Sequence, residues 1–462
     1  MSTDNNAEKD VLANLYDRIY AILTYSPTRG EGTGMDAKAI AVQMTQNEVL
    51  NLESFADALS GGNPGGDITT AEAFSLYVDK VPTKLDGAVW APGDALAKRY
   101  GELVSGASID PKLLPSKEQE DTYRRLQALL QAEVEKKSLV TGAVTRTIAD
   151  SPLFTAYKEA KEAYTTALLD GAQVVLDADL STNAGKRQAN LDKRRADAVV
   201  DARYKDWVAA GKSDVDEILD ALESIKNNAI SAVIADARAT MDPAKWLTSN
   251  TEIGQTWMLA SATPSNWTEP TCKGTTLTVS SDSLEAVTNN SATTYANSSR
   301  GWFWWGSNES SGSTETKDMG MQSTALELSA ELVLVRIQRP WLNELLFTMQ
   351  GWSNNGYSST HAISDGKGGG GALPGIPIAF VMARNVTIKA TFSSSASSLF
   401  KNESRTSSSS GWGWGPFGGG NNSSTSKSSG DTFSSEGNTV TISFRQPQVI
   451  AWINKFVPAC PT

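Results

Sequence analysis

The stretch Thr439-Val440-Thr441-Ile442-Ser443-Phe444-Arg445-Gln446-Pro447 alternates polar and apolar side chains and then stops at a proline. Alternation with a period of two is typical of a β-strand that buries one face. A second apolar, β-rich run, Leu326 to Ile337, ends in the similar triplet Gln338-Arg339-Pro340. The two runs predict that the second half of the chain is built from antiparallel strands.

Each of these strands closes a longer unit that occurs twice. The first unit begins at Leu277-Thr278-Val279 and the second at Val386-Thr387-Ile388-Lys389-Ala390-Thr391-Phe392. Both units then cross a Ser/Asn-rich stretch that contains aromatic residues. The repeated order predicts an internal duplication, in which the strand near Leu332 to Ile337 corresponds to that near Val440 to Phe444. The alternative is convergence of two low-complexity stretches.

The two aromatic clusters are the most unusual feature of the chain. They are Gly301-Trp302-Phe303-Trp304-Trp305-Gly306 and Gly411-Trp412-Gly413-Trp414-Gly415-Pro416-Phe417, both set in Ser, Asn, Thr and Gly. Large aromatic side chains on polar loops usually contact a lipid interface, a partner protein or another part of the same protein. The candidate contact residues are Trp302, Phe303, Trp304, Trp305, Trp412, Trp414 and Phe417.

The first half of the chain has the period of helices. Apolar side chains recur every three or four residues from Val11 to Leu23. Thr69 to Glu72 and Ser116 to Gln119 have the spacing of a capping box, which starts a helix. These signals predict three early helices.

Longer helices follow from Ser151, which precedes a proline at the first helical position. A second long helix is expected from about Ala184 to Ala210, and a third from Ser213 towards Met241. Such lengths are typical of an antiparallel bundle or an extended helical hairpin.

The composition changes abruptly near residue 245. Of the 13 tryptophans only Trp90 and Trp207 precede it, and Ser, Thr, Asn and Gly become more frequent after it. We therefore expect an α+β fold with two domains. An all-helical bundle over residues 1–245, with a further boundary expected near 140–150, precedes an antiparallel, sandwich-like β domain over residues 246–462.

The charge of the chain argues against nucleic acid as its partner. The 462 residues carry a formal net charge of -11, whereas binding to phosphates requires a basic surface. One basic stretch, Lys186 to Lys205, is interrupted by Asp192, Asp197 and Asp201. This interleaving is typical of a solvated helix face with local ion pairs.

The N-terminal residues Met1 to Glu8 lack the basic and apolar regions of a secretory signal peptide. Apolar runs such as Ile376 to Met382 are too short for a membrane helix. We expect a protein that is made soluble in the cytoplasm, with export by a leaderless route left open.

Few residues in the chain suggest catalysis or metal binding. Cys272 and Cys460 lie at the start and end of the β-rich half, where they would form a disulfide after export or remain thiols in the cytoplasm. One histidine, His361, and two distant cysteines do not give zinc spacing. We predict no metal and no cofactor, and we expect a protein that is not an enzyme, although spacing alone does not identify a carboxylate pair.

Aromatic tips on polar arms favour contact with a lipid interface, where an indole keeps its ring in the headgroup region and its N–H wet. In general design the chain resembles pore-forming proteins that carry aromatic-tipped hairpins beside helical segments. The arms are too polar to span a bilayer, so surface anchoring is the favoured form.

Three alternatives use the same aromatic residues. The tips could join copies of the chain into a homo-oligomer or filament, or stack on carbohydrate. Alternatively, both loops fold back onto their own domain.

Overall fold

The fold is taken from a computed structural model, which describes residues 7–24, 35–109, 116–137, 144–176, 182–226, 229–249, 255–283, 291, 323–354, 356–357, 362–392, 413–418 and 432–460. Helices and antiparallel strands are both abundant in it, so the fold is α+β.

Two long strands run through the whole main sheet. They are β9 (Ser323–Gln338) and β11 (Gly375–Phe392), and they pair with each other in antiparallel orientation. On its other side, each long strand pairs with two shorter strands placed end to end. The shorter strands are β16 (Gln448–Phe456) and β15 (Thr439–Phe444) along β11, and β7 (Ser261–Thr263) and β8 (Thr275–Ser280) along β9.

The sheet therefore has two halves that share β9 and β11. The core half has the order β1-β16-β11-β9-β7, where β1 spans Ile40–Val49, and the loop half has the order β14-β15-β11-β9-β8, where β14 spans Thr432–Glu436. The register of β11 shifts between Arg384 and Thr387, and Asn385 adopts a φ of 55° there. This bulge lies where β11 exchanges β16 for β15.

Helix α1 (Ala7–Thr24) covers one face of the sheet, because its apolar stripe packs on the inward side chains of both halves. The hydroxyl of Tyr16 donates a hydrogen bond of 2.8 Å to the carbonyl oxygen of Val42 in β1. By the described residues, the opposite face is covered only in the core half. There α2 (Ile68–Val78) contributes Phe74 to a cluster with Phe380 and Trp452.

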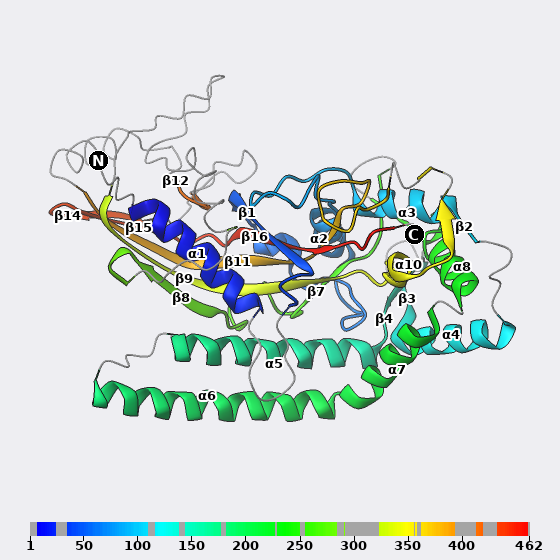
Figure 1. Cartoon of the computed structure of the whole chain (residues 1–462), viewed down its shortest axis with the longest axis horizontal. Coiled ribbons are helices and arrows are strands. Elements are labelled where there is room, and N and C mark those ends of the chain that lie inside the picture. The colour runs from blue at the N-terminus through cyan, green and yellow to red at the C-terminus, as the bar shows by residue number, and fades with distance from the viewer. Residues whose placement is uncertain are drawn as a thin grey trace, which may run out of the picture.

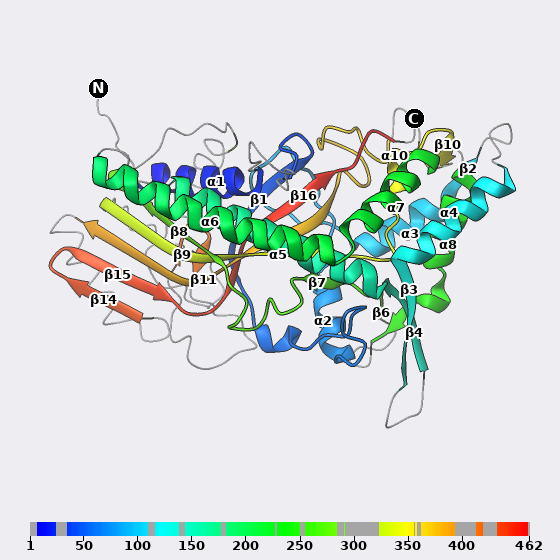
Figure 2. The same ribbon diagram turned by 90° about the horizontal axis from the view of Figure 1, so that it is seen from below.

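A helical hairpin flanks the edge of the sheet that β7 and β8 form. It consists of α5 (Pro152–Leu176) and α6 (Asn183–Ala209), with α5 next to the sheet and α6 outermost (Figures 1 and 2). Covering an edge strand with a helix shields its free backbone groups from other chains.

The remaining helices gather at one end of the molecule, which we call the helical end (Figure 1). They share an apolar core that includes Tyr100, Tyr123 and Trp341. The helices are α3 (Leu96–Gly106), α4 (Lys117–Leu130), α7 (Lys212–Ile225), α8 (Ile230–Thr240) and α10 (Leu345–Thr348). Three two-stranded pairs complete this part: β2 (Ala107–Ile109) with β10 (Trp352–Asn354), β3 (Gln131–Lys137) with β4 (Val144–Asp150), and β5 (Leu247–Thr248) with β6 (Thr256–Trp257).

The expectation of an all-helical region over residues 1–245 is wrong. Strand β1 pairs with β16 from the C-terminal end of the chain, and β3 and β4 form a hairpin inside the helical region. Strand β1 forms through its partner β16, which lies about four hundred residues further along the chain. The strands after residue 245 lie mainly in one sheet, rather than in two facing sheets.

The strands of the two predicted repeat units form two antiparallel pairs, β8 with β9 and β11 with β15. The internal duplication itself stays a prediction.

Several helix boundaries follow the sequence signals. The capping box at Ser116 and Gln119 is present, and Ser151 Oγ accepts from the Phe154 N–H at the start of α5. The capping box predicted at Thr69 is wrong, since Asp67 caps α2 instead. The third long helix is interrupted between α7 and α8.

Candidate functional site

The second aromatic cluster is part of the protein core. Strands β12 (Gly413–Trp414) and β13 (Phe417–Gly418) pair as a small hairpin, in which Trp414 is 0% and Phe417 1% exposed. Gly415 has a φ of 58°, and a Cβ there would lie 2.7 Å from Cδ2 of Leu12 in α1. Trp414 and Phe417 are therefore not exposed tips, and the alternative that a loop folds back is correct for these two residues.

Trp302, Phe303, Trp304, Trp305 and Trp412 lie outside the described residues. The structure does show where the connection with the first aromatic cluster attaches. It leaves after β8 and re-enters at the start of β9, two strands that pair side by side. Both attachment points lie at the end of the sheet away from the helical end, which we call the loop end (Figure 1).

The loop half of the sheet has one polar face. Thr276, Thr278 and Lys389 are exposed on it, whereas their neighbours along each strand are buried under α1. Lys389 forms an ion pair of 3.4 Å with Glu327 across the strands. Among the residues that the structure describes, no helix covers this face.

The N-terminal half of α6 lies beside the same end of the molecule (Figures 1 and 2). It carries the basic stretch that begins at Lys186. Three ion pairs join neighbouring turns of this helix: Lys193–Asp197, Arg195–Asp192 and Arg203–Asp206. The expectation of local ion pairs on a solvated helix face is confirmed for these three pairs.

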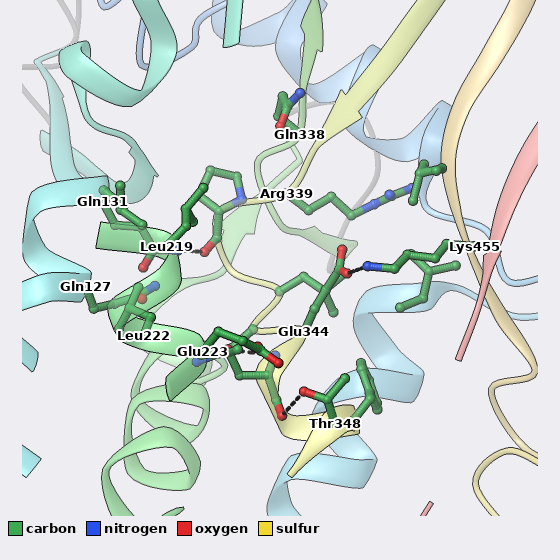
Figure 3. A pocket seen from close by; sticks show the side chains of 18 of the residues that line it. Gln127, Gln131, Leu219, Leu222, Glu223, Gln338, Arg339, Glu344, Thr348 and Lys455 are labelled. Carbon is green, nitrogen blue, oxygen red and sulfur yellow. Dashed lines mark hydrogen bonds and ion pairs between the residues drawn. The ribbon is translucent and has the colours of Figure 1, made fainter. Parts of the chain in front are cut away.

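A pocket of about 580 Å³ lies at the helical end, between α4, α7, α10 and the last residues of β16 (Figure 3). Its walls mix apolar side chains, such as Leu222 from α7 and Phe456 from β16, with many polar and charged ones. Polar groups enter from both sides: Gln127 and Glu223 on one, and Glu344 on the other. Small-molecule sites are typically lined mainly by apolar side chains, so this mixed lining is not characteristic of one.

Two ion pairs lie in the walls of this pocket. Lys158 lies 2.8 Å from Asp150, and Lys455 lies 2.6 Å from Glu344. Burial lowers the pKa of Lys158, while Asp150 opposes that shift. Burial also lowers the pKa of Arg339 to about 10, and its guanidinium donates to the carbonyl oxygens of Pro377 and Val78 at 2.6 and 2.7 Å.

Cys272 and Cys460, for which the sequence left a disulfide and free thiols open, are both free and buried in the structure. They belong to different apolar clusters, one beside α2 and one at the helical end. Burial raises the pKa of Cys272 and raises that of Cys460 to about 12, so both remain protonated thiols at neutral pH. His361 lies outside the described residues, and within the described part no group of three or more His, Cys, Asp or Glu could hold a metal ion.

Sequence reasoning missed the pocket, because its lining comes from segments far apart in the chain, from α4 to the end of β16. Gln338-Arg339-Pro340 lies in its wall, but the sequence signals only the end of a strand there. No described helix is both long and apolar enough to cross a membrane. Comparisons with protein-family models, with curated proteins and with solved structures found no match to this chain.

Proposed function

We propose that this protein is a non-enzymatic contact protein that binds the surface of a lipid membrane with its loop end. The anchor in this proposal is the first aromatic cluster, Trp302 to Trp305, together with Trp412. Trp414 and Phe417 stabilise the fold instead, because both are buried against α1.

One observation carries the proposal. The connection with four aromatic residues in succession is held at both ends by a pair of neighbouring strands, at the end of the sheet beside the basic half of α6. Tryptophan side chains favour the headgroup region of a bilayer, and basic side chains favour anionic lipids. In this proposal, insertion of tryptophan side chains and attraction of basic side chains to anionic lipids act together at the loop end.

Self-association is the second candidate. The outer helix α6 exposes large apolar side chains, with Leu191 at 50%, Val199 at 52% and Val208 at 45% exposure. Exposed apolar groups on a helix favour packing against another copy. A homo-oligomer would still present several aromatic clusters to one membrane, so the two candidates are compatible.

Flotation with liposomes tests the lipid proposal. We expect the wild-type protein to float with phosphatidylcholine vesicles, and a variant with Trp302→Ser, Trp304→Ser and Trp305→Ser to stay in the dense fraction. Circular dichroism and the melting temperature of this variant should equal those of the wild type.

A single Tyr357→Ser variant, changed in a partly buried aromatic of the helical end, is the control and should float. Loss of oligomers in the triple variant without any change in flotation would favour self-association. A large drop in its melting temperature would show that the first cluster is buried too and would contradict the proposal.

A further inference from the structure

The side of α6 that faces away from α5 is exposed along the helix. Val200, Tyr204 and Trp207 point inward, as part of the apolar core beside α5. Arg187, Arg194 and Lys205 fall seven and eleven residues apart, which groups them on one side of a helix with 3.6 residues per turn, about 120° from the packed side. All three are exposed, and α6 is the outermost layer of the molecule (Figure 2).

Local ion pairs do not account for these side chains. The pairs on α6 use Lys193, Arg195 and Arg203. Lys186, Arg187, Arg194 and Lys205 form no ion pair with any described residue. The helix therefore presents cations to the solvent in addition to those that its own aspartates neutralise.

Helix stability does not account for them either. The N-terminus of a helix carries a partial positive charge, so cations there are unfavourable and acidic residues are favourable. Helix α6 has no acidic residue in its first turn, and Lys186 and Arg187 follow directly. Lys186 and Arg187 therefore lie at the positive end of the helix dipole, which repels them.

The positive charge is concentrated in the N-terminal half of α6. From Lys186 to Arg195 there are five basic residues and one acidic residue, a local charge of +4 in a chain whose net charge is -11. Leu191 lies between Arg187 and Arg194 and is 50% exposed. A row of cations with an exposed leucine is typical of helices that lie on a membrane surface.

We propose that the outer face of α6, which carries Arg187, Arg194 and Lys205, binds the phosphate-bearing headgroups of anionic lipids. The inference rests on the proposed lipid contact and names its electrostatic partner. The occupant follows from charge complementarity, because anionic headgroups attract the cations that the aspartates of α6 leave unpaired.

The test compares two vesicles, one of phosphatidylcholine alone and one with about a third of phosphatidylserine. The variant carries Arg187→Gln, Arg194→Gln and Lys205→Gln. Because each basic side chain strengthens binding to an anionic surface roughly fivefold, the variant should bind the anionic vesicles about a hundredfold more weakly. Its binding to phosphatidylcholine should be unchanged.

A matched variant with Lys117→Gln, Arg124→Gln and Arg125→Gln removes three exposed cations from α4 at the helical end and should bind as the wild type does. Excess inorganic phosphate at constant ionic strength should leave vesicle binding intact, since a lipid surface offers many headgroups at once. Displacement by phosphate alone would indicate a site for the free ion and overturn the assignment to lipid.

Different outcomes of this test would overturn this inference alone, or the proposed lipid contact as well. Equal binding of the wild type to both vesicles would overturn this inference and leave the aromatic anchor standing. Binding to neither vesicle would overturn both proposals. Tight binding to single-stranded RNA, with none to anionic vesicles, would replace lipid by nucleic acid as the partner of α6.

Discussion

The core half and the loop half of the main sheet share the same two long strands, yet they are buried differently. In β9 the side chains on the face away from α1 change from Glu327 and Ser329 in the loop half to Val333, Val335 and Ile337 in the core half. In the core half this face is buried under α2 and its neighbours, whereas in the loop half it stays polar. In β9, therefore, the part in the loop half has one buried face, and the part in the core half has two.

The two halves also differ in what they connect to. The core half leads into the helical end and its pocket, which has two ion pairs in its walls. The loop half bears the attachment points of the connection with the first aromatic cluster, beside the basic face of α6. We therefore expect substitutions in the core half to lower the free energy of unfolding most, and we assign the proposed lipid contact to the loop half.

The largest effect is expected for Phe380→Ala in the core half. Phe380 is 0% exposed and its ring centroid lies 5.4 Å from that of Trp452. Truncation should lower the free energy of unfolding by about 3–5 kcal/mol. Urea unfolding measures this, with Lys389→Ala on the same strand as the control. A similar loss for both variants would contradict the difference between the halves.

Trp414→Ala should lower the stability by about 3 kcal/mol, because the indole fills a buried site against α1 in the described core. Trp304→Ala, in the other cluster, should leave the unfolding midpoint unchanged. Thermal unfolding of the two variants side by side would show whether the clusters differ as proposed. Equal losses would mean that both clusters are core.

A pH dependence is expected where α5 meets β9. Glu162 is 2% exposed and pairs with Arg336, and burial raises its pKa above 4.5 although Arg336 and Lys161 lower it. The folded protein then holds the proton more tightly than the unfolded chain. The contribution to stability is therefore complete below about pH 4.5 and is lost as the pH rises through the folded pKa.

Unfolding of the wild type and of Glu162→Gln across a pH series measures this contribution. The advantage of the wild type over the variant should shrink from acidic to neutral pH. An advantage that grows with pH would show that the ion pair with Arg336 outweighs burial.

The smallest effect is expected for Thr278→Val on the polar face of the loop half. Thr278 is exposed, so the free energy of unfolding should change by less than about 0.5 kcal/mol. A larger change in urea unfolding would reveal that something packs on this face.

Local signals predicted the elements that depend on nearby residues. The helix after Ser151, the capping box at Ser116 and the strand at Thr439 to Phe444 were all expected, because their periodicity and caps are properties of neighbouring side chains. Strand β1 was missed, since its stability comes from pairing with β16.

The candidate site was predictable only in part. The sequence indicated that the aromatic clusters contact something, but the two clusters have the same local composition. Trp414 belongs to one apolar cluster with side chains of α1, about four hundred residues earlier in the chain, and the neighbouring Gly415 lies against Leu12. The exposure of a side chain on a polar loop depends on such distant contacts, which composition does not encode.

Site-specific fluorescence tests the central claim most directly. The native thiols Cys272 and Cys460 are buried, so a cysteine introduced as Trp304→Cys can be labelled selectively with an environment-sensitive dye in the folded protein. We expect the emission of this label to shift to the blue when phosphatidylcholine vesicles are added, and the emission of a label at Thr348→Cys, at the helical end, to stay unchanged. A blue shift at position 348 alone, or at neither position, would contradict membrane contact through the loop end.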